Sequence, residues 1–245
     1  MVGAGGLGSP VALYLAAAGV GEIGLVDFDT VELSNLPRQV LYGTSDVGRP
    51  KLAAAKERLE VLNPGVQVIL HAHRLTARNA LSVLRRYDVV IDGSDNLPTR
   101  YLVSDAAALL GMPDVYGSVY RFEGQMSVFD ARRGPCYRCL YPEPPPPELL
   151  PTCAEAGVLN VVPGLVGMLQ ATEALKLLLG QGRPMVGRLL LFDALTLEFR
   201  EVPVRKNPRC AVCSRSASLR RIPAYPGVGE GSRGGAPAST SRGPE

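Results

Sequence analysis

Two pairs of cysteines are the residues of this 245-residue chain whose spacing most directly implies chemistry. Cys136 with Cys139 and Cys210 with Cys213 each form a C-x-x-C pair. Each pair can place two thiolates on one tetrahedral metal ion, and zinc is the metal that four sulfur ligands favour. About 70 residues separate the pairs, so the fold must bring them together. We predict a closed, structural zinc site at these four cysteines, with unrelated thiols as the alternative.

A glycine-rich stretch at the start of the chain predicts a nucleotide site. Gly3, Gly5 and Gly8 fit G-x-G-x-x-G, which permits a tight turn and a close approach of the backbone to a phosphate group. Asp27 ends the next predicted strand, where a ribose-binding carboxylate belongs. Glycine clusters also form plain turns, and a nicotinamide-dependent oxidoreductase shares this pattern. The chain contains no G-x-x-x-x-G-K-[ST], so a P-loop is excluded.

Charged residues at the ends of predicted elements extend this site. Lys51 lies in the first turn of a predicted helix, where the helix dipole disfavours a cation. An anionic ligand would explain it, and a solvated surface lysine is the alternative. Asp95 follows a buried strand, and ligands bind outside the carboxyl ends of parallel strands, so we expect Asp95 and Asp27 to face one crevice. Asp95 could also be the N-cap of the helix that follows.

The pattern along the chain predicts an α/β fold: a Rossmann-like, mostly parallel sheet with helices on both faces, continued by antiparallel strands. Helices are expected over 8–18, 50–62, 77–86, the segment through Leu110, and 163–179. Strands are expected over 22–27, 66–70, 87–92, 115–116, 124–129, 189–193 and 197–202. The last two strands leave no room for a crossover helix, so we expect a hairpin.

The expected domain covers residues 1–213, and residues 214–245 form a Gly, Ser, Pro and Arg-rich tail that we expect to be disordered. Only Met1 and Val2 precede the glycines, whereas a Rossmann fold has a full strand there. We therefore expect the natural protein to begin upstream, with a strand and a dimerising helix.

Composition excludes several classes of function. A hydrophobic fraction of 46% is typical of a soluble globular protein, and a net charge of +3 spread over scattered basic residues does not favour nucleic-acid binding. The apolar run 164–180 is interrupted by Glu173 and Lys176 and is too short for a membrane span of about 20 residues. Cysteines in metal-type pairs indicate a reducing cytosol, so we expect a cytoplasmic protein and no membrane.

Taken together, the motifs resemble the E1-like adenylyltransferases typified by ThiF, MoeB and HesA, over nearly everything up to Cys213. The motifs that carry this resemblance are Gly3 to Gly8, Asp27-Phe28-Asp29, Ser34 to Gln39, Lys51, Ser94-Asp95-Asn96, Arg121 to Gln125, Thr152 to Gly157 and both C-x-x-C pairs. The resemblance implies that the C-terminal Gly-Gly carboxylate of a ubiquitin-like sulfur carrier attacks the α-phosphate of ATP. Pyrophosphate leaves, and the acyl-adenylate serves thiamin, molybdopterin or tRNA thiolation pathways.

The resemblance also implies a role for each site residue. Asp95 would hold Mg²⁺, Asp27 would bind the ribose, and Cys153 is a candidate for a covalent intermediate with the carrier. The remaining residues expected at ATP are Gly5 and Gly6 at the phosphates, Arg38 and Lys51 at the developing charge, and Asn35, Gln39 and Asn96 as polar contacts. Family members form homodimers, and since no rhodanese domain follows Cys213, we expect a separate sulfur donor.

Three alternatives remain open at this stage. One is a related ATP-dependent enzyme that activates a tRNA-linked carboxylate, and another is the nicotinamide-dependent oxidoreductase. The third is a zinc-stabilised adaptor without catalytic activity. ATP binding and carrier-dependent exchange of pyrophosphate into ATP would separate the four hypotheses.

Overall fold

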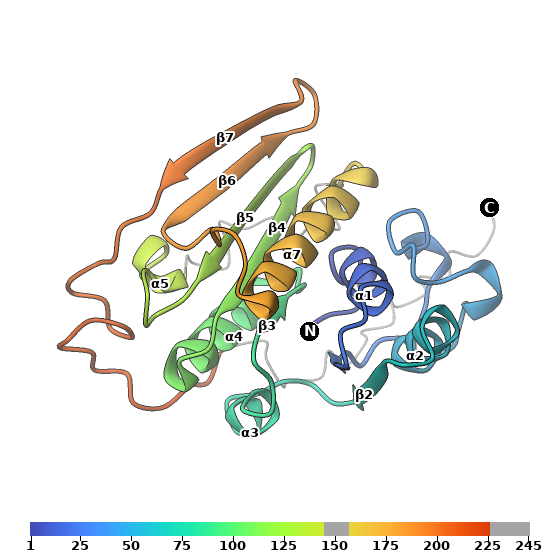
Figure 1. Ribbon diagram of the computed structural model, residues 1–245, viewed down its shortest axis with the longest axis horizontal. Coiled ribbons are helices and arrows are strands. Elements are labelled where there is room, and N and C mark those ends of the chain that lie inside the picture. The colour runs from blue at the N-terminus through green and yellow to red at the C-terminus, as the bar shows by residue number, and fades with distance from the viewer. Residues whose placement is uncertain (145–156, 226–245) are drawn as a thin grey trace, which may run out of the picture.

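A computed structural model describes residues 1–144 and 157–225 of the chain (Figure 1). Its helices are α1 (Gly8–Ala17), α2 (Lys51–Leu62), α3 (Ala80–Leu84), α4 (Leu97–Leu110), α5 (Tyr137–Leu140) and α7 (Val161–Leu179). Its strands are β1 (Glu22–Val26), β2 (Gln67–His71), β3 (Val90–Asp92), β4 (Asp114–Tyr120), β5 (Glu123–Phe129), β6 (Arg188–Asp193) and β7 (Glu198–Pro203).

The sheet changes from parallel to antiparallel along its width. Strands β1 and β2 are parallel, and the remaining strands follow in the order β3-β4-β5-β6-β7, of which only β3 and β4 pair in parallel. Val2 stands between the two groups and bridges both Val26 and Asp92. This arrangement confirms the predicted α/β fold, with its antiparallel continuation and the hairpin of β6 and β7.

The tight turns of the antiparallel part explain its topology. Arg121 between β4 and β5 and Leu197 between β6 and β7 both adopt left-handed backbone conformations, with φ of 51° and 57°. Such turns reverse the chain within a few residues, so β5 pairs with β4 and β7 pairs with β6, whereas β6 reaches β5 after the longer connection that contains α5 and α7. Strand β3 is shorter than expected, since it begins at Val90 rather than at Tyr87.

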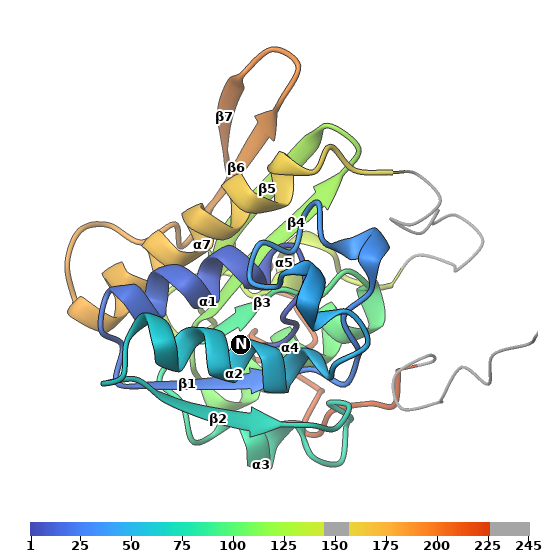
Figure 2. The same ribbon diagram turned by 90° about the vertical axis from the view of Figure 1, so that its right-hand side faces the viewer.

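Helices cover both faces of the sheet, as predicted. Successive residues of β4 point to opposite faces of the sheet. Val115 belongs to the hydrophobic core under α1 and α7, and Tyr116 belongs to the core under α3 and α4. Helices α1 and α7 run side by side (Figure 2), and a Cβ on Gly167 of α7 would lie 2.5 Å from the carbonyl oxygen of Leu7. The two helix backbones therefore approach closely.

Helix α7 is a core helix despite its apolar composition. Among the described helices it alone is long and apolar enough to cross a membrane, but it packs on β4 and β5. At its centre the buried Gln170 donates from Nε2 to the carbonyl oxygens of Asp92, at 2.8 Å, and Val115, at 2.9 Å. Through these two hydrogen bonds the side chain joins α7 to β3 and β4, as expected of a helix packed inside the protein.

Two local expectations need revision. The N-cap of α4 is Asn96, whose side chain accepts from the backbone N–H of Thr99 at 3.0 Å, so Asp95 does not cap the helix. The expected tail also falls partly on described residues: Ile222 and Tyr225 are buried against the core. Packed residues therefore continue past Ser214, and residues 226–245 lie outside the described part of the chain.

Candidate active site

A cavity of about 670 Å³ opens at the carboxyl ends of β1 and β3, a size that suits a nucleotide. It is lined by all nine residues predicted to bind ATP: Gly5, Gly6, Asp27, Asn35, Arg38, Gln39, Lys51, Asp95 and Asn96. The structure thus brings together residues from the glycine loop, the segment after β1, the start of α2 and the loop after β3. What each residue does there follows from its local contacts.

The glycine loop has a shape that only glycine permits at two positions. Gly3 has φ of 91°, and a Cβ there would lie 2.8 Å from the carbonyl oxygen of Gly93. A Cβ on Gly8 would lie 2.1 Å from the carbonyl oxygen of Gly3. The loop can therefore turn directly from the sheet into α1, which leaves the backbone of Gly5 and Gly6 along the cavity.

Asp27 braces this loop as well as lining the cavity. Its Oδ2 accepts from the backbone N–H of Ala4 at 2.8 Å, and its Oδ1 accepts from the backbone N–H groups of Phe28 and Asp29. From the other side the hydroxyl of Tyr42 donates to the carbonyl oxygen of Ala4 at 2.9 Å. Burial raises the pKa of Tyr42, so this hydroxyl keeps its proton and remains a donor.

Two cations beside the cavity are held in defined positions. Arg38 donates from Nη2 to Oδ1 of Asn35 at 2.6 Å. Lys51 is buried at the start of α2, and its Nζ pairs with Oδ2 of Asp29 at 3.1 Å. Asp29 is half exposed. If an anionic ligand in the cavity paired with the ammonium group of Lys51, the carboxylate of Asp29 would still be solvated by water.

Gln39 has an unsatisfied polar atom next to the glycine loop. The residue is buried, and within residues 1–144 and 157–225 its Oε1 has no hydrogen-bond partner. Its Nε2 lies 3.6 Å from the position of a Cβ on Gly5. A buried amide atom without a partner is costly. A polar ligand in the cavity would satisfy it, which fits a nucleotide at this place.

The loop after β3 presents an exposed carboxylate over a buried acidic pair. Asp95 is exposed, and its Oδ1 accepts a long hydrogen bond of 3.4 Å from the side-chain amide of Asn96. Oxygen ligands of this kind suit Mg²⁺.

The same loop is fixed by the buried Asp92 at the end of β3. Its Oδ1 accepts hydrogen bonds from the backbone N–H and the hydroxyl of Ser94. Burial raises the pKa of Asp92, and that of neighbouring Asp114 lies well above its ordinary value for the same reason.

Several residues of the cavity wall were not predicted as site residues. The guanidinium carbon of Arg74 lies 3.7 Å from the centre of the Phe28 ring, so the cation sits over the face of the ring, and both residues line the cavity. Asp29 and the buried Arg100 also line the cavity. The signals were available, because Phe28 and Asp29 directly follow β1 and Arg74 follows the carboxyl end of β2, at the edge of the sheet where ligands bind.

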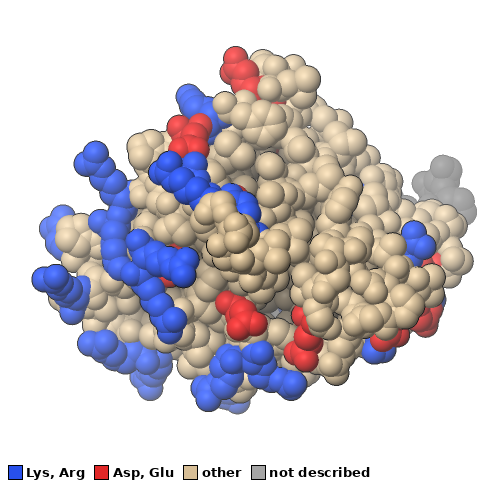
Figure 3. Space-filling model, in the orientation of Figure 1, with Lys and Arg blue, Asp and Glu red and all other residues tan. Residues whose placement is uncertain are grey.

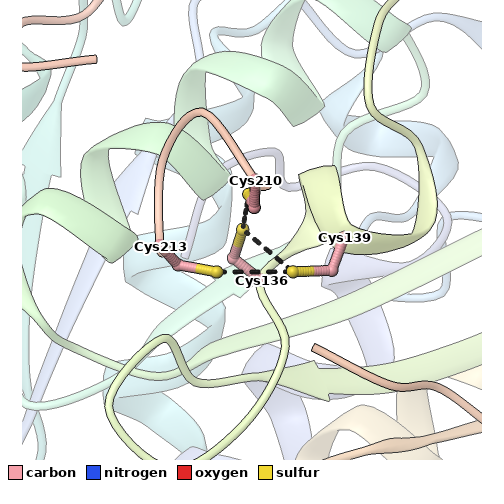
Figure 4. A group of neighbouring side chains, drawn as sticks. All are labelled: Cys136, Cys139, Cys210 and Cys213. Carbon is pink, nitrogen blue, oxygen red and sulfur yellow. Dashed lines mark hydrogen bonds between the residues drawn. The ribbon is translucent and has the colours of Figure 1, made fainter. Parts of the chain in front are cut away.

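The four paired cysteines converge as predicted (Figure 4). All four sulfur atoms lie within 4.8 Å of one another, with 3.5 Å from Cys136 to Cys210 and 3.3 Å from Cys139 to Cys213. Sulfurs on one tetrahedral zinc ion are about 3.8 Å apart, since each Zn–S bond is about 2.3 Å. Four thiolates this close together repel one another, so a bound cation is needed for all four to be deprotonated. The group fits a metal ion.

The remaining candidate, Cys153, lies outside the described residues. It falls in the range 145–156. Its role therefore stays a prediction.

Comparisons with known proteins place the chain among related sequences. The profile of the ThiF family matches residues 1–212. A Thermus thermophilus protein named sulfur carrier protein adenylyltransferase is 57% identical over 230 residues, covering 92% of this chain and 85% of that protein. The Sus scrofa adenylyltransferase and sulfurtransferase MOCS3 is 51% identical and covers 93% of this chain. This chain spans about half of MOCS3, namely 50% of its length.

A comparison of structures supports the fold. The crystal structure of E. coli MccB with MccA-N7isoASN matches with a TM-score of 0.75 over 87% of this chain and 66% of that chain. The sequence identity is 21%, so this likeness concerns the architecture alone.

Proposed function

The chain belongs to the ThiF family of E1-like adenylyltransferases, and from this premise we propose that it adenylates the C-terminal carboxylate of a ubiquitin-like sulfur carrier protein with ATP. The observation that carries the proposal is the convergence of Arg38, Lys51 and Asp95 on the cavity of the glycine loop. Attack by a carboxylate on a triphosphate brings two anions together. A site for this reaction therefore needs cations at the phosphates and a carboxylate that can hold a metal ion.

Each residue has a part in the proposed reaction. The backbone of Gly5 and Gly6 would donate to phosphate oxygens, and Arg38 and Lys51 would stabilise the charge that develops on the α-phosphate and the leaving pyrophosphate. Asp95 would hold Mg²⁺, which supplies charge neutralisation when bound. Asp27 would accept from the ribose hydroxyls, since its Oδ2 has one partner and room for another.

A second hollow offers a path for the carrier tail. A depression of about 340 Å³ lies on the antiparallel strands β4 to β7, and Val119 of β4 lines both this hollow and the nucleotide cavity. Exposed aromatic side chains of Tyr120 and Phe199 lie on the same strands. We propose that the carrier docks on these strands and that its Gly-Gly tail passes Val119 to reach the α-phosphate.

The second half of the proposed function is sulfur transfer. Cys153 is the proposed site of a covalent adduct with the activated carrier. Its thiolate would attack the carbonyl carbon of the acyl-adenylate, form a thioester and release AMP, and it has no part in forming the adenylate. A separate protein would supply sulfur, and the product would serve thiamin, molybdopterin or tRNA thiolation in the cytoplasm. We propose one zinc ion per chain at the four paired cysteines.

Exchange of labelled pyrophosphate into ATP tests the first half of the proposal. We expect exchange only when a ubiquitin-like carrier with a Gly-Gly C-terminus is present, and loss of exchange when the terminal glycine is removed. Exchange that depends on a tRNA-linked carboxylate would show that the protein is instead the related ATP-dependent enzyme that activates such a carboxylate. Absence of ATP binding would favour the adaptor.

The Cys153→Ala variant tests the second half. It should keep carrier-dependent exchange and lose any carrier adduct that thiol reductants or hydroxylamine release. If the folded, zinc-loaded variant loses exchange, Cys153 acts in adenylation and the proposed division between the two steps is wrong.

A further inference from the structure

The positive charge of the chain is concentrated in one short segment. Residues 204–225 contain no Asp or Glu and six basic residues: Arg205, Lys206, Arg209, Arg215, Arg220 and Arg221. The totals for the chain are 26 Lys and Arg and 23 Asp and Glu, which leaves 20 basic and 23 acidic residues elsewhere. The net positive charge therefore comes entirely from this segment, and the impression of scattered basic residues was wrong for this part of the sequence.

In the folded protein these six basic residues lie on the surface, and two further arginines lie beside them. All six side chains are exposed. Nζ of Lys206 donates to the carbonyl oxygen of Ala131 at 2.7 Å, which places the exposed Arg132 and Arg133 beside the segment. Figure 3 shows the resulting concentration of Lys and Arg along the left side of the molecule. We call these eight residues the basic face: Arg132, Arg133, Arg205, Lys206, Arg209, Arg215, Arg220 and Arg221.

Few internal partners neutralise the basic face. Arg133 lies 3.5 Å from Oδ2 of Asp130, and Arg132 donates to the carbonyl oxygen of Leu110 at 3.4 Å. Within the described ranges none of the arginines of 204–225 forms an ion pair with a carboxylate. A zinc ion with four thiolates carries a net charge of −2, so the cysteine site balances only part of the six positive charges of the segment.

The basic face is held firmly and lies away from the nucleotide cavity. In its middle, Cys210 and Cys213 lie against the other cysteine pair of the chain. At its end, Ile222 and Tyr225 are buried in the core. Arg132 sits at the C-terminal end of α4, whereas Asn96 at the N-terminal end lines the cavity. A helix of 14 residues separates these ends by about 21 Å. The basic face is thus a fixed, positively charged surface, and none of its eight residues lines the nucleotide cavity.

We propose that the basic face binds the phosphate backbone of double-helical nucleic acid. Seven of its eight residues are arginine, whose planar guanidinium fits two phosphate oxygens at once. Tyr225 is the only aromatic residue of 204–225, and it is buried. The segment therefore offers no ring on which unpaired bases could stack, and contacts to the backbone of a duplex remain. This inference does not depend on the proposed adenylation.

Binding of duplex probes to charge-reversal variants tests the proposal. The probes are an RNA hairpin and a DNA hairpin of about 16 base pairs each, measured by fluorescence anisotropy with the zinc-loaded full chain between about 50 and 200 mM salt. The variant Arg220→Glu with Arg221→Glu removes charge from the basic face. The matched control, Arg58→Glu with Arg183→Glu, makes the same change of charge at exposed positions elsewhere. The two hairpins distinguish RNA from DNA as the source of the backbone.

We expect the wild-type protein to bind at least one hairpin. The basic-face variant should bind it at least about tenfold more weakly, with a slope of log affinity against log salt smaller by roughly 2, and the control should stay near wild type. Zinc content and pyrophosphate exchange should be unchanged in both variants. Equal weakening by both variants, no binding of either hairpin, or equally tight binding of polyglutamate would each overturn the proposal. The last result would assign the basic face to an acidic protein.

Discussion

At the scale of single residues, the exposed carboxylate of Asp95 sits where a metal ion could reach both the protein and a triphosphate. Within residues 1–144 and 157–225 its side chain accepts one hydrogen bond, a long one of 3.4 Å from Asn96. A change at this position should therefore affect chemistry and spare the fold.

Asp95→Asn should lower carrier-dependent pyrophosphate exchange at least about a hundredfold, because the amide is a poor ligand for Mg²⁺. The melting temperature and zinc content should match the wild type. The control is Asp88→Asn, an exposed aspartate that does not line the cavity. Retention of exchange by Asp95→Asn would remove this residue from the metal site.

Asp114 is the residue whose protonation should govern stability. It is buried, and its Oδ1 has no hydrogen-bond partner within the described segments. Burial raises its pKa well above the ordinary value. The native state therefore holds a proton that the unfolded chain releases near pH 4, and stability falls as the pH rises from there toward the native pKa.

Asp114→Asn removes this titration, so the variant should gain stability over the wild type as the pH rises above about 4, until the native pKa of Asp114 is passed. The gain is at most about 1.4 kcal/mol per pH unit within that window. Urea unfolding at several pH values measures it, with Asp88→Asn as the exposed control. A difference between variant and wild type that is constant with pH would contradict the prediction.

At the scale of elements, the end of the segment 204–225 is fastened to α4 by a buried polar cluster. Arg138 of α5 donates to both carboxylate oxygens of Asp105, at 2.8 and 3.1 Å. The hydroxyl of Tyr225 donates to Asp105 and accepts from Arg138. The cluster joins a helix, the first cysteine pair and the last described residue of the chain.

Removing the charge of Asp105 should cost far more than removing the hydroxyl of Tyr225. Asp105→Asn leaves the nearly buried guanidinium of Arg138 without its counter-charge, which costs about 3–5 kcal/mol. Tyr225→Phe removes one hydroxyl group and should cost about 1 kcal/mol. Unfolding midpoints of the zinc-loaded proteins measure both effects, and equal shifts would show that the cluster does not act through the charge pair.

The cysteine site is the second fastening of the same segment. Chelation of the metal, or Cys210→Ser, should release residues 204–225 while the nucleotide cavity persists, since none of these residues lines it. Hydrogen exchange should speed up in 204–225 and remain slow in β3 and α4. Freshly purified, reduced protein without zinc would contradict the site assignment.

At the scale of the whole molecule, α1 and α7 leave apolar side chains on their outer surface. Tyr14 of α1 is 54% exposed, and Val161 and Met168 of α7 are 68% and 39% exposed. Because neighbouring helices carry them, we propose that this side forms the homodimer interface.

Sedimentation should show a dimer of the wild-type chain, and Tyr14→Glu with Met168→Glu should convert it to monomers. Val61→Glu, at an exposed apolar position of α2, should leave the dimer intact. A wild-type monomer, or dissociation by Val61→Glu, would refute this interface.

Features of the fold and the site that depend on neighbouring residues could be predicted from the sequence, and features that depend on distant contacts could not. The spacing from the glycines to Asp27 is set within one strand-helix-strand unit, so the cavity could be located from the chain alone. The stacking of Arg74 on Phe28 and the unsatisfied Gln39 depend on how loops fold over that unit, and residue types do not encode this. Asn96 and Asp95 are neighbouring residues that both favour an N-cap, so the choice between them needed backbone geometry.

The separation of 74 residues from Cys136 to Cys210 also sets an order of events during the protein's synthesis. At about 5–20 residues per second, the ribosome takes roughly 4 to 15 seconds to deliver the second cysteine pair after the first. During this interval α7, β6 and β7 are made, and only a half-complete set of ligands exists. All four sulfurs can therefore hold one metal ion only after the ribosome has made α7, β6 and β7.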